Sequence, residues 1–348
     1  MPNPFCPGSS VTFHATPSNG GPLPAYQWKV NGINAGVNSD TYSYNPANGD
    51  SIRCVMTSNL ACVTGNPASS AKIIMSGTLA PIVTFTSCFD TITSVNAKPF
   101  KLKGGIPLGG TYSGPGVNSP TGVFTPSTAG TGTKIITYSY TNVSLCSASK
   151  SRNIIVQAAP VFVCGNNLTD IRDSKIYPSV QIGSQCWMAK NLDYGITVLS
   201  SLVQNDNCIS EKYCYNDLAG NCTNFGGLYQ WDEMMKYDDT QAGQGFCPPG
   251  WHVPTENEWQ TLFNFYNGNG FAGRPLQDLG FSGFNALRSG VFFLNSSMSF
   301  NGFATLFWSS TSWGQFKALS HGMNTYNNSV SLYPSSRANA FPVRCLRD

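Results

Sequence analysis

Charged side chains are scarce in this chain of 348 residues. Asp, Glu, Lys and Arg make up 11% of it, against about 25% in an average soluble domain. The formal net charge of +3 is too small and too dispersed to indicate a nucleic-acid partner. Apolar residues nevertheless reach 41% and aromatic residues 12%. Because disordered chains lack aromatic and β-branched residues, we expect a folded protein with a sizeable core.

Long apolar runs are absent as well. No stretch approaches the roughly 18 apolar residues of a transmembrane helix, so we expect no membrane span. Met1 is followed by Pro-Asn-Pro-Phe-Cys, without the basic and apolar regions of a secretory signal. We interpret Met1 as the edge of a larger polypeptide or of a processed chain.

Sequence signatures of catalysis are missing. The three histidines are His14, His252 and His321, and we interpret His14 and His252 as structural. No GxSxG or HExxH motif and no zinc-type spacing occurs. Acidic side chains gather at residues 232–239, where we expect a solvated face. The sequence therefore predicts no enzyme, no catalytic residues, no metal and no cofactor.

Twelve cysteines indicate the compartment. They are too many for a reduced cytosolic protein without metal sites, so we expect an oxidising, extracellular location, on the cell surface or secreted.

Composition changes near Ala158. Residues 1–157 hold nine basic and three acidic side chains, whereas residues 158–348 hold eleven basic and fourteen acidic ones and six of the seven tryptophans. A shift of this size marks a domain boundary. Residues 1–157 divide again into two sets of short, alternating, β-branched runs separated by Gly, Pro and Asn-Gly. That pattern is typical of all-β sandwiches. We expect domains at residues 1–78, 79–158 and 159–348.

Cysteine spacing repeats in the two sandwiches. In each, one cysteine opens the first strand and another precedes the last strand, which predicts the bridges Cys6–Cys62 and Cys88–Cys146. Both would close long loops. Cys54 then remains as a buried thiol, and a Cys54–Cys62 bridge is the competing interpretation.

Three stretches resemble known families. Residues 9–75, with SVTFHATPSNGG and YQWKVNG, resemble the tandem immunoglobulin-like repeats of Bacteroidetes surface adhesins, and residues 80–157, with PFKLKGGIPLGGTYSGPGV, resemble a related repeat. Such repeats usually build stalks. Residues 161–348, with VQIGSQCWMAKNL, CPPGWHVPTENEWQTL and FPVRCLRD, resemble the Fibrobacter major paralogous (FISUMP) domain. This resemblance implies a C-type-lectin-like fold. The fold class is thus two all-β immunoglobulin-like sandwiches followed by an α+β C-type-lectin-like domain.

Local patterns in the third segment agree with an α+β domain. Residues 226–235 and 255–265 predict helices, the second opened by a capping box of Thr255 and Glu258. Five tryptophans of this segment are expected in the core: Trp187, Trp231, Trp251, Trp259 and Trp308. The sixth, Trp313, is assigned to a ligand surface below.

The third segment holds seven cysteines. The lectin-like resemblance implies a Cys247–Cys345 bridge. Cys214 and Cys222 enclose a short loop, and Cys164 and Cys186 flank a hairpin, so each pair is predicted to bond. Cys208 is left as a second free thiol beside Cys54, with Cys214 or Cys222 as alternative partners.

The segment from Trp308 to Ala340 has the composition of a recognition surface. Rigid aromatics supply contact area, and Ser and Asn supply adaptable hydrogen bonds. In lectin-like domains this late segment forms the binding face, which implies a ligand surface at Trp313, Phe316, Tyr326, Asn327, Tyr333 and Arg337. The tripeptides of calcium-dependent sugar sites and the reactive cysteine pair of formylglycine-generating enzymes are absent.

These observations favour an extracellular adhesin segment whose stalk presents a lectin-like domain to a glycan or protein ligand on another surface. Neighbouring domains of a larger chain or fibre are further expected partners. The alternatives are a subunit or cap of a surface fibre, and a phage or secreted receptor-binding tip. The resemblance also implies O-glycosylation at Ser51 and Thr91, which stand in Asp-Ser/Thr-aliphatic triplets.

Overall fold

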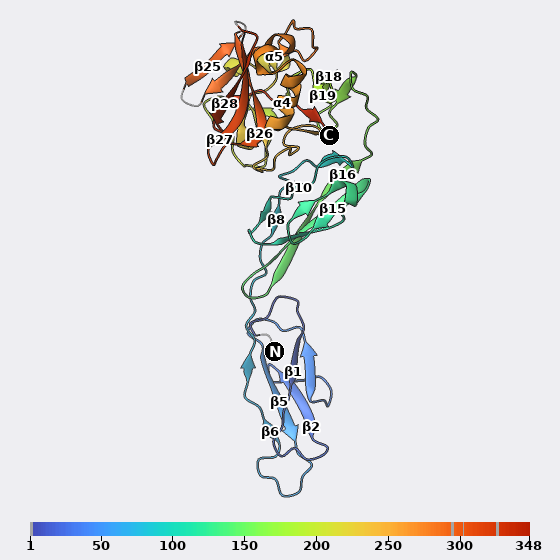
Figure 1. Cartoon of the computed structure of the whole chain (residues 1–348). Coiled ribbons are helices and arrows are strands. Elements are labelled where there is room, and N and C mark those ends of the chain that lie inside the picture. The colour runs from blue at the N-terminus through green and yellow to red at the C-terminus, as the bar shows by residue number, and fades with distance from the viewer. Residues whose placement is uncertain (1–2, 294–295, 302, 325–326) are drawn as a thin grey trace. The chain divides into compact units, whose positions relative to one another are not determined.

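Strands predominate over helices in the computed structural model, which describes residues 3–293, 296–301, 303–324 and 327–348 (Figure 1). None of the helices within these ranges is long and apolar enough to cross a membrane.

Close backbone contacts divide the chain into two compact units. The first comprises residues 1–85, 105–111 and 138–150, and the second comprises residues 86–104, 112–137 and 151–348. The boundary runs through residues 79–158, which the sequence assigns to one sandwich. The division at residues 78 and 158 stays a prediction.

Two sheets build most of the first unit. The smaller one pairs β1 (Val11–His14) with β4 (Thr41–Tyr44). The larger has the order β3 (Ile33–Ala35), β2 (Ala25–Val30), β5 (Ser51–Thr57), β6 (Ala68–Ser69), with β7 (Ile73–Ile74) also on β5. Alternation along β1 sends Val11 and Phe13 inward and leaves Thr12 and His14 exposed. The inward side chains pack with Trp28, consistent with a β-sandwich.

Short strands continue through residues 84–157. They form three sheets: β8 (Thr84–Phe85) with β11 (Gly105–Ile106); β10 (Phe100–Lys101), β14 (Val123–Phe124) and β13 (Val117–Asn118); and β12 (Thr111–Ser113), β15 (Gly132–Thr141), β16 (Ser147–Gln157) and β9 (Ile92–Ser94). One helical turn, α1 (Pro126–Ala129), follows β14. The strand-rich character predicted for this region is therefore present.

In its described residues, the C-terminal half combines three larger sheets with helices. The sheets are β17 (Asn167–Thr169), β18 (Ile176–Ile182), β19 (Gln185–Met188), β30 (Leu346–Arg347) and β23 (Trp251–His252); β22 (Tyr229–Gln230), β29 (Ala340–Phe341), β24 (Ser289–Phe293) and β25 (Ser296–Asn301); and β26 (Ala304–Ser312), β27 (Lys317–Asn324) and β28 (Val330–Ser336). A small parallel pair joins β20 (Ile196–Thr197) and β21 (Glu211–Lys212). The last strand, β30, lies between β19 and β23, so the chain end is built into a sheet.

Helices of the C-terminal half are short. They are η1 (Tyr215–Asp217), α2 (Ala219–Phe225), α3 (Trp231–Met234), α4 (Glu256–Phe265) and α5 (Asn269–Leu276). The predicted capping box opens α4: the Thr255 side chain accepts from the Glu258 backbone, and the Glu258 side chain accepts from Thr255. Residues 226–235 contain the short α3 alone instead of a continuous helix, because β22 takes Tyr229 and Gln230. The predicted core tryptophans are buried: Trp187, Trp231, Trp251, Trp259 and Trp308.

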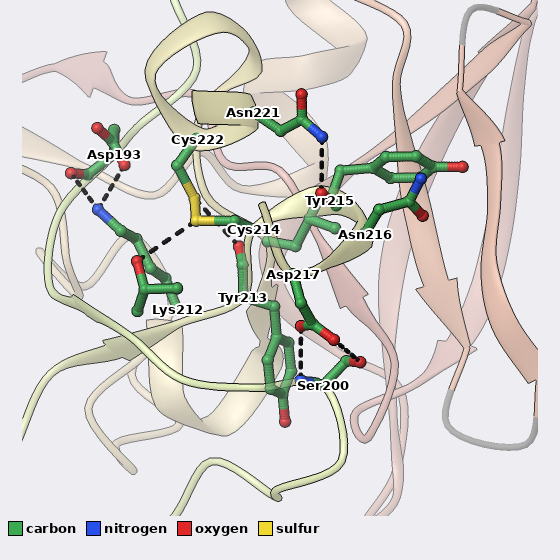
Figure 2. Close-up of a disulfide and its surroundings, with 12 residues drawn as sticks. Asp193, Ser200, Lys212, Tyr213, Cys214, Tyr215, Asn216, Asp217, Asn221 and Cys222 are labelled. Atoms are coloured by element: carbon green, nitrogen blue, oxygen red, sulfur yellow. Dashed lines mark hydrogen bonds and ion pairs between the residues drawn. A yellow bond between two sulfur atoms is a disulfide. The ribbon is translucent and has the colours of Figure 1, made fainter. Parts of the chain in front are cut away.

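Five disulfides are present among the described residues, and three are the predicted pairs of the C-terminal half: Cys164–Cys186, Cys214–Cys222 and Cys247–Cys345. Figure 2 shows the Cys214–Cys222 bridge. Beside it, Lys212 Nζ donates to Asp193 Oδ1 at 2.5 Å, and the backbone and hydroxyl of Ser200 both donate to Asp217 at 2.8 Å.

The other two bridges correct the sequence analysis. Cys6 pairs with Cys146 instead of Cys62, at a Cα–Cα distance of 5.4 Å. Thr78 explains the choice, because its backbone donates to the carbonyl of Phe5 while its hydroxyl lies 3.0 Å from Cys146 Sγ. Repeat spacing indicates similar positions in two repeats, but only proximity in space selects a partner.

Cys88 pairs with Cys208 instead of Cys146, so Cys208 is not a free thiol. Lys103 Nζ approaches Asp206 at 3.2 Å and Lys236 Nζ approaches Asp90 at 2.7 Å. These ion pairs hold residues 86–104 against the C-terminal half, beside the loop that carries Cys208. The free cysteines are the predicted Cys54, which is buried, and Cys62, which is exposed.

This pairing predicts a specific thiol count. Native protein treated with iodoacetamide should be alkylated at the exposed Cys62 within minutes, and at the buried Cys54 only after denaturation without reductant. Peptide mass mapping measures both. A Cys54–Cys62 bridge would leave no alkylated cysteine and would contradict the structure.

Candidate functional site

An exposed turn joins β26 to β27 and carries two of the predicted ligand residues. The backbone of Trp313 donates to the carbonyl of Lys317 at 2.8 Å, which closes the turn. The side chain of Trp313 is 59% exposed and that of Phe316 is 73% exposed. Because both aromatic side chains are exposed on one short turn, we take this turn as a candidate interaction surface.

Arg337 holds this turn in place from beneath. Its guanidinium lies 4.0 Å above the Trp231 ring and donates to Asp232 and Asp239 at 3.0 Å. Its backbone donates to the carbonyl of Phe316, also at 3.0 Å. Burial lowers the pKa of Arg337, but its hydrogen bond to Asp239 and the charge of Asp232 raise that pKa above its ordinary value overall. Arg337 therefore stays charged and positions Phe316.

A cavity of about 250 Å³ lies where the turn meets α3. Phe316 and Arg337 line it, so the structure brings these two predicted residues together. Carboxylates and amides line the rest: Gln204, Gln230, Asp232, Glu233 and Gln315, with Val203, Tyr237, Ser336 and Ala338. We call this the Phe316 cavity. Its lining therefore combines the aromatic ring of Phe316 and other apolar surface with several groups that can form hydrogen bonds.

Two glutamines of the Phe316 cavity hold each other in position. The backbone of Gln230 donates to Gln204 Oε1 at 2.8 Å, and the backbone of Gln204 donates to Gln230 Oε1 at 3.2 Å. Gln230 Nε2 also donates to the carbonyl of Ala338 at 2.8 Å. Such reciprocal bonds fix the side-chain orientation of both amides before a ligand arrives.

Glu233 is the cavity residue whose environment is most unusual for a carboxylate. It is buried, and one oxygen accepts from the backbone of Glu211 at 2.9 Å. Burial raises the pKa of Glu233 to about 7. The expectation of a solvated acidic face at residues 232–239 is therefore wrong for Glu233 and holds for the exposed Asp238 and Asp239. Glu233 points inward because α3 is a single buried turn.

The remaining predicted ligand residues lie elsewhere. Tyr333 is 47% exposed on β28 and lines a separate, mainly apolar cavity of about 560 Å³ with Phe303 and Met323. Asn327 is exposed and accepts from Ser329. Tyr326 lies outside the described residues. The predicted group of six is thus distributed over more than one surface.

Sequence reasoning missed the polar side chains that line the Phe316 cavity. Gln204 and Gln230 come from segments far from residues 308–340, and no spacing rule connects them with Phe316. The adjacent acidic residues Asp232 and Glu233 are the one signal in the sequence. The burial of Glu233, which makes its carboxyl unusual, cannot be read from the sequence.

Hydrogen bonding, aromatic stacking and proton exchange are the chemistry that the Phe316 cavity offers. Within the described residues, no group of three or more His, Cys, Asp or Glu is arranged as metal ligands. Of the two predicted glycosylation residues, Ser51 is half-buried at the start of β5, and Thr91 is exposed.

The buried Glu233 carboxyl makes stability depend on pH. Because its folded pKa of about 7 exceeds its unfolded value, the protein should lose stability as pH rises from about 4.5 through 7, by about 3 kcal/mol in total. Glu233→Gln should remove most of this slope and be more stable than the wild type at pH 8.5. Urea denaturation at pH 5 and 8.5 measures the difference, with the exposed Asp238→Asn as control. If the stability of the wild type and of Glu233→Gln depends equally on pH, ionisation of Glu233 does not reduce the free energy of unfolding, and the prediction is wrong.

Comparison with known families finds a match in the C-terminal half. Residues 180–347 match the sequence model of the Fibrobacter succinogenes major domain. No curated protein that was compared with the chain matches it. The matched domain family suggests a surface-associated protein, and five disulfides fit an extracellular or secreted one. The segment that carries the Phe316 cavity is therefore similar to the Fibrobacter succinogenes major domain.

Proposed function

We propose that this chain is part of an extracellular adhesin whose C-terminal half, with a lectin-like fold, recognises a glycan through the Phe316 cavity. The observation that carries the proposal is that a highly exposed aromatic ring lines the same cavity as several amide and carboxylate groups, and that a buried arginine fixes the backbone of this aromatic residue. Leaving Phe316 in water is unfavourable for an isolated chain. Stacking on a ligand would remove that cost.

The lining favours a sugar over a wholly apolar ligand. Gln204, Gln230 and Asp232 present amide and carboxylate groups that can donate to and accept from hydroxyls. Phe316 offers an apolar face of the kind that packs against a sugar ring. A few convergent polar groups beside an aromatic surface are the usual design of a small-molecule site. The proposal is one of binding rather than catalysis.

The N-terminal residues have the complementary role. Their short strands, consistent with β-sandwich domains, and their resemblance to adhesin repeats support a stalk that presents the C-terminal half to its ligand. The Cys6–Cys146 and Cys88–Cys208 bridges would resist unfolding of this stalk outside the cell.

Glycan-array binding of the full chain tests the proposal. Any glycan that the wild type binds should bind Phe316→Ala at least about tenfold more weakly, a loss of about 1.4 kcal/mol. Gln230→Ala should weaken binding of the same glycan, because its amide is held in the cavity wall.

Phe271→Ala is the matched control, since Phe271 is similarly exposed but lies on α5, outside the Phe316 cavity. It should bind like the wild type. Trp313→Ala tests the rest of the turn, because Trp313 is not among the residues that line the Phe316 cavity. If the wild type binds no glycan, or if Phe316→Ala binds as the wild type does, the proposed site is wrong.

A further inference from the structure

A buried lysine and a buried aspartate meet beside the Cys214–Cys222 bridge. Lys212 is 5% exposed and Asp193 is 8% exposed. Lys212 Nζ lies 2.5 Å from Asp193 Oδ1 and 3.1 Å from the backbone carbonyl oxygen of Asp193 (Figure 2). The carboxyl carbon is bonded directly to Oδ1, so the amine lies close to the separation of about 3–3.5 Å at which a nucleophile attacks. The two side chains are therefore within reach of a covalent reaction.

Backbone bonds hold both residues in this position. The strand β21, which ends at Lys212, pairs in parallel with β20, and the backbone of Val198 donates to the carbonyl of Lys212 at 2.9 Å. The backbone of Asp193 donates to the Tyr177 hydroxyl at 3.1 Å. Gly227 leaves room for the lysine stem, because a Cβ at this position would lie 3.0 Å from Lys212 Cδ. Reactants fixed in this way can reach effective concentrations of about 10⁵ M or more.

A second lysine contacts the other oxygen of the same carboxyl group. Lys175 Nζ lies 2.9 Å from Asp193 Oδ2 and also donates to the backbone carbonyl of Asp193. Burial lowers the pKa of Lys212, and this outweighs the opposite effect of Asp193. Burial also lowers the pKa of Lys175, but its hydrogen bond to Asp193 raises that pKa above its ordinary value overall. Lys212 is thus the amine that gives up a proton more easily, and Lys175 stays an ammonium.

We propose that Lys212 and Asp193 form an intramolecular isopeptide bond, and that the Lys175 ammonium stabilises the charge that develops during the reaction. Lys212 first passes a proton to Asp193 Oδ1, which leaves a neutral amine beside a neutral carboxyl group. The amine lone pair then attacks Cγ, a C–N bond forms, and negative charge develops on Oδ2 beside Lys175. The attacking nitrogen gives a second proton to Oδ1. The bond from Cγ to Oδ1 breaks, and Oδ1 leaves as water.

A similar ion pair in the same unit lacks these conditions and is an internal control. Lys236 Nζ lies 2.7 Å from Asp90, but Asp90 also accepts from Arg172 at 3.2 Å. A guanidinium does not release its proton in proteins, so Asp90 keeps a permanent cation beside it and stays a carboxylate, which amines do not attack. We therefore expect Lys236 to remain a free amine. The isopeptide proposal does not depend on glycan binding, since neither Lys212 nor Asp193 lines the Phe316 cavity.

Peptide mapping of the full chain tests the proposal. After denaturation and reduction, trypsin cleaves at free lysines but not at an amide of Lys212. The expected product is a peptide of residues 191–236 that is one water lighter than its sequence, in place of separate peptides 191–212 and 213–236. Cleavage after Lys236 in the same digest shows that a former ion pair does not itself block trypsin. Fragmentation of the peptide should place the link between Lys212 and Asp193.

Three variants assign the roles. Lys212→Arg keeps a cation but lacks the amine nucleophile, so it should be cleaved after residue 212 and keep its full mass. Lys175→Met should reduce the linked fraction at least about tenfold, whereas Lys317→Met, at an exposed lysine, should leave it unchanged. The wild-type digest is decisive even if a variant fails to fold.

Two results in the wild-type digest overturn the bond. One is a peptide 191–212 of full mass, which would leave Lys212 and Asp193 as an ion pair. The other is a loss of water without a block at Lys212, which would indicate dehydration of Asp193 with its own backbone. An equal linked fraction in Lys175→Met and the wild type overturns the part assigned to Lys175.

Discussion

A single buried guanidinium organises the C-terminal half. Arg344 is fully buried and donates to Asn191 Oδ1 at 2.6 Å and to the carbonyls of Met188, Phe284 and Asn285 at 2.5–2.9 Å. Burial lowers the pKa of Arg344 to about 9. A buried cation without a carboxylate is stable only if oxygen atoms surround it. The end of β19 and the loop before β24 must therefore converge on the C-terminal strand.

The neighbouring cysteine reinforces the same constraint. Cys345 bonds to Cys247, and β30 follows immediately between β19 and β23. The bridge closes a loop with a sequence separation of 98, which is worth about 4–5 kcal/mol in the chain-entropy model. Arg337 directly follows β28, whose pairing with β27 places it beside Phe316 and within reach of Asp232.

A second buried charge group joins residues 86–104 to the C-terminal half. Asp90 accepts from Arg172 at 3.2 Å and from Lys236 at 2.7 Å, and the Tyr194 hydroxyl donates to it at 3.2 Å. Although burial raises it, these cations lower the pKa of Asp90 to about 2. Both cations come from the C-terminal half. Separation of segment 86–104 would break these ion pairs, which is costly because the charges are buried. This group and the Cys88–Cys208 bridge both link residues 86–104 to the C-terminal half.

The sequence by itself determined those features that depend on local chemistry. Alternating apolar residues placed strands such as β1 and β5, and Thr255 with Glu258 specified the start of α4. The tryptophan-rich motifs placed the core of the C-terminal half, and short separation or family resemblance indicated three bridges. Only the tertiary structure decided that Cys6 meets Cys146, that Cys88 meets Cys208, and that Gln204, Gln230 and Glu233 surround Phe316. Those pairings join distant segments, and their free energy depends on burial and proximity, which the order of residues does not encode locally.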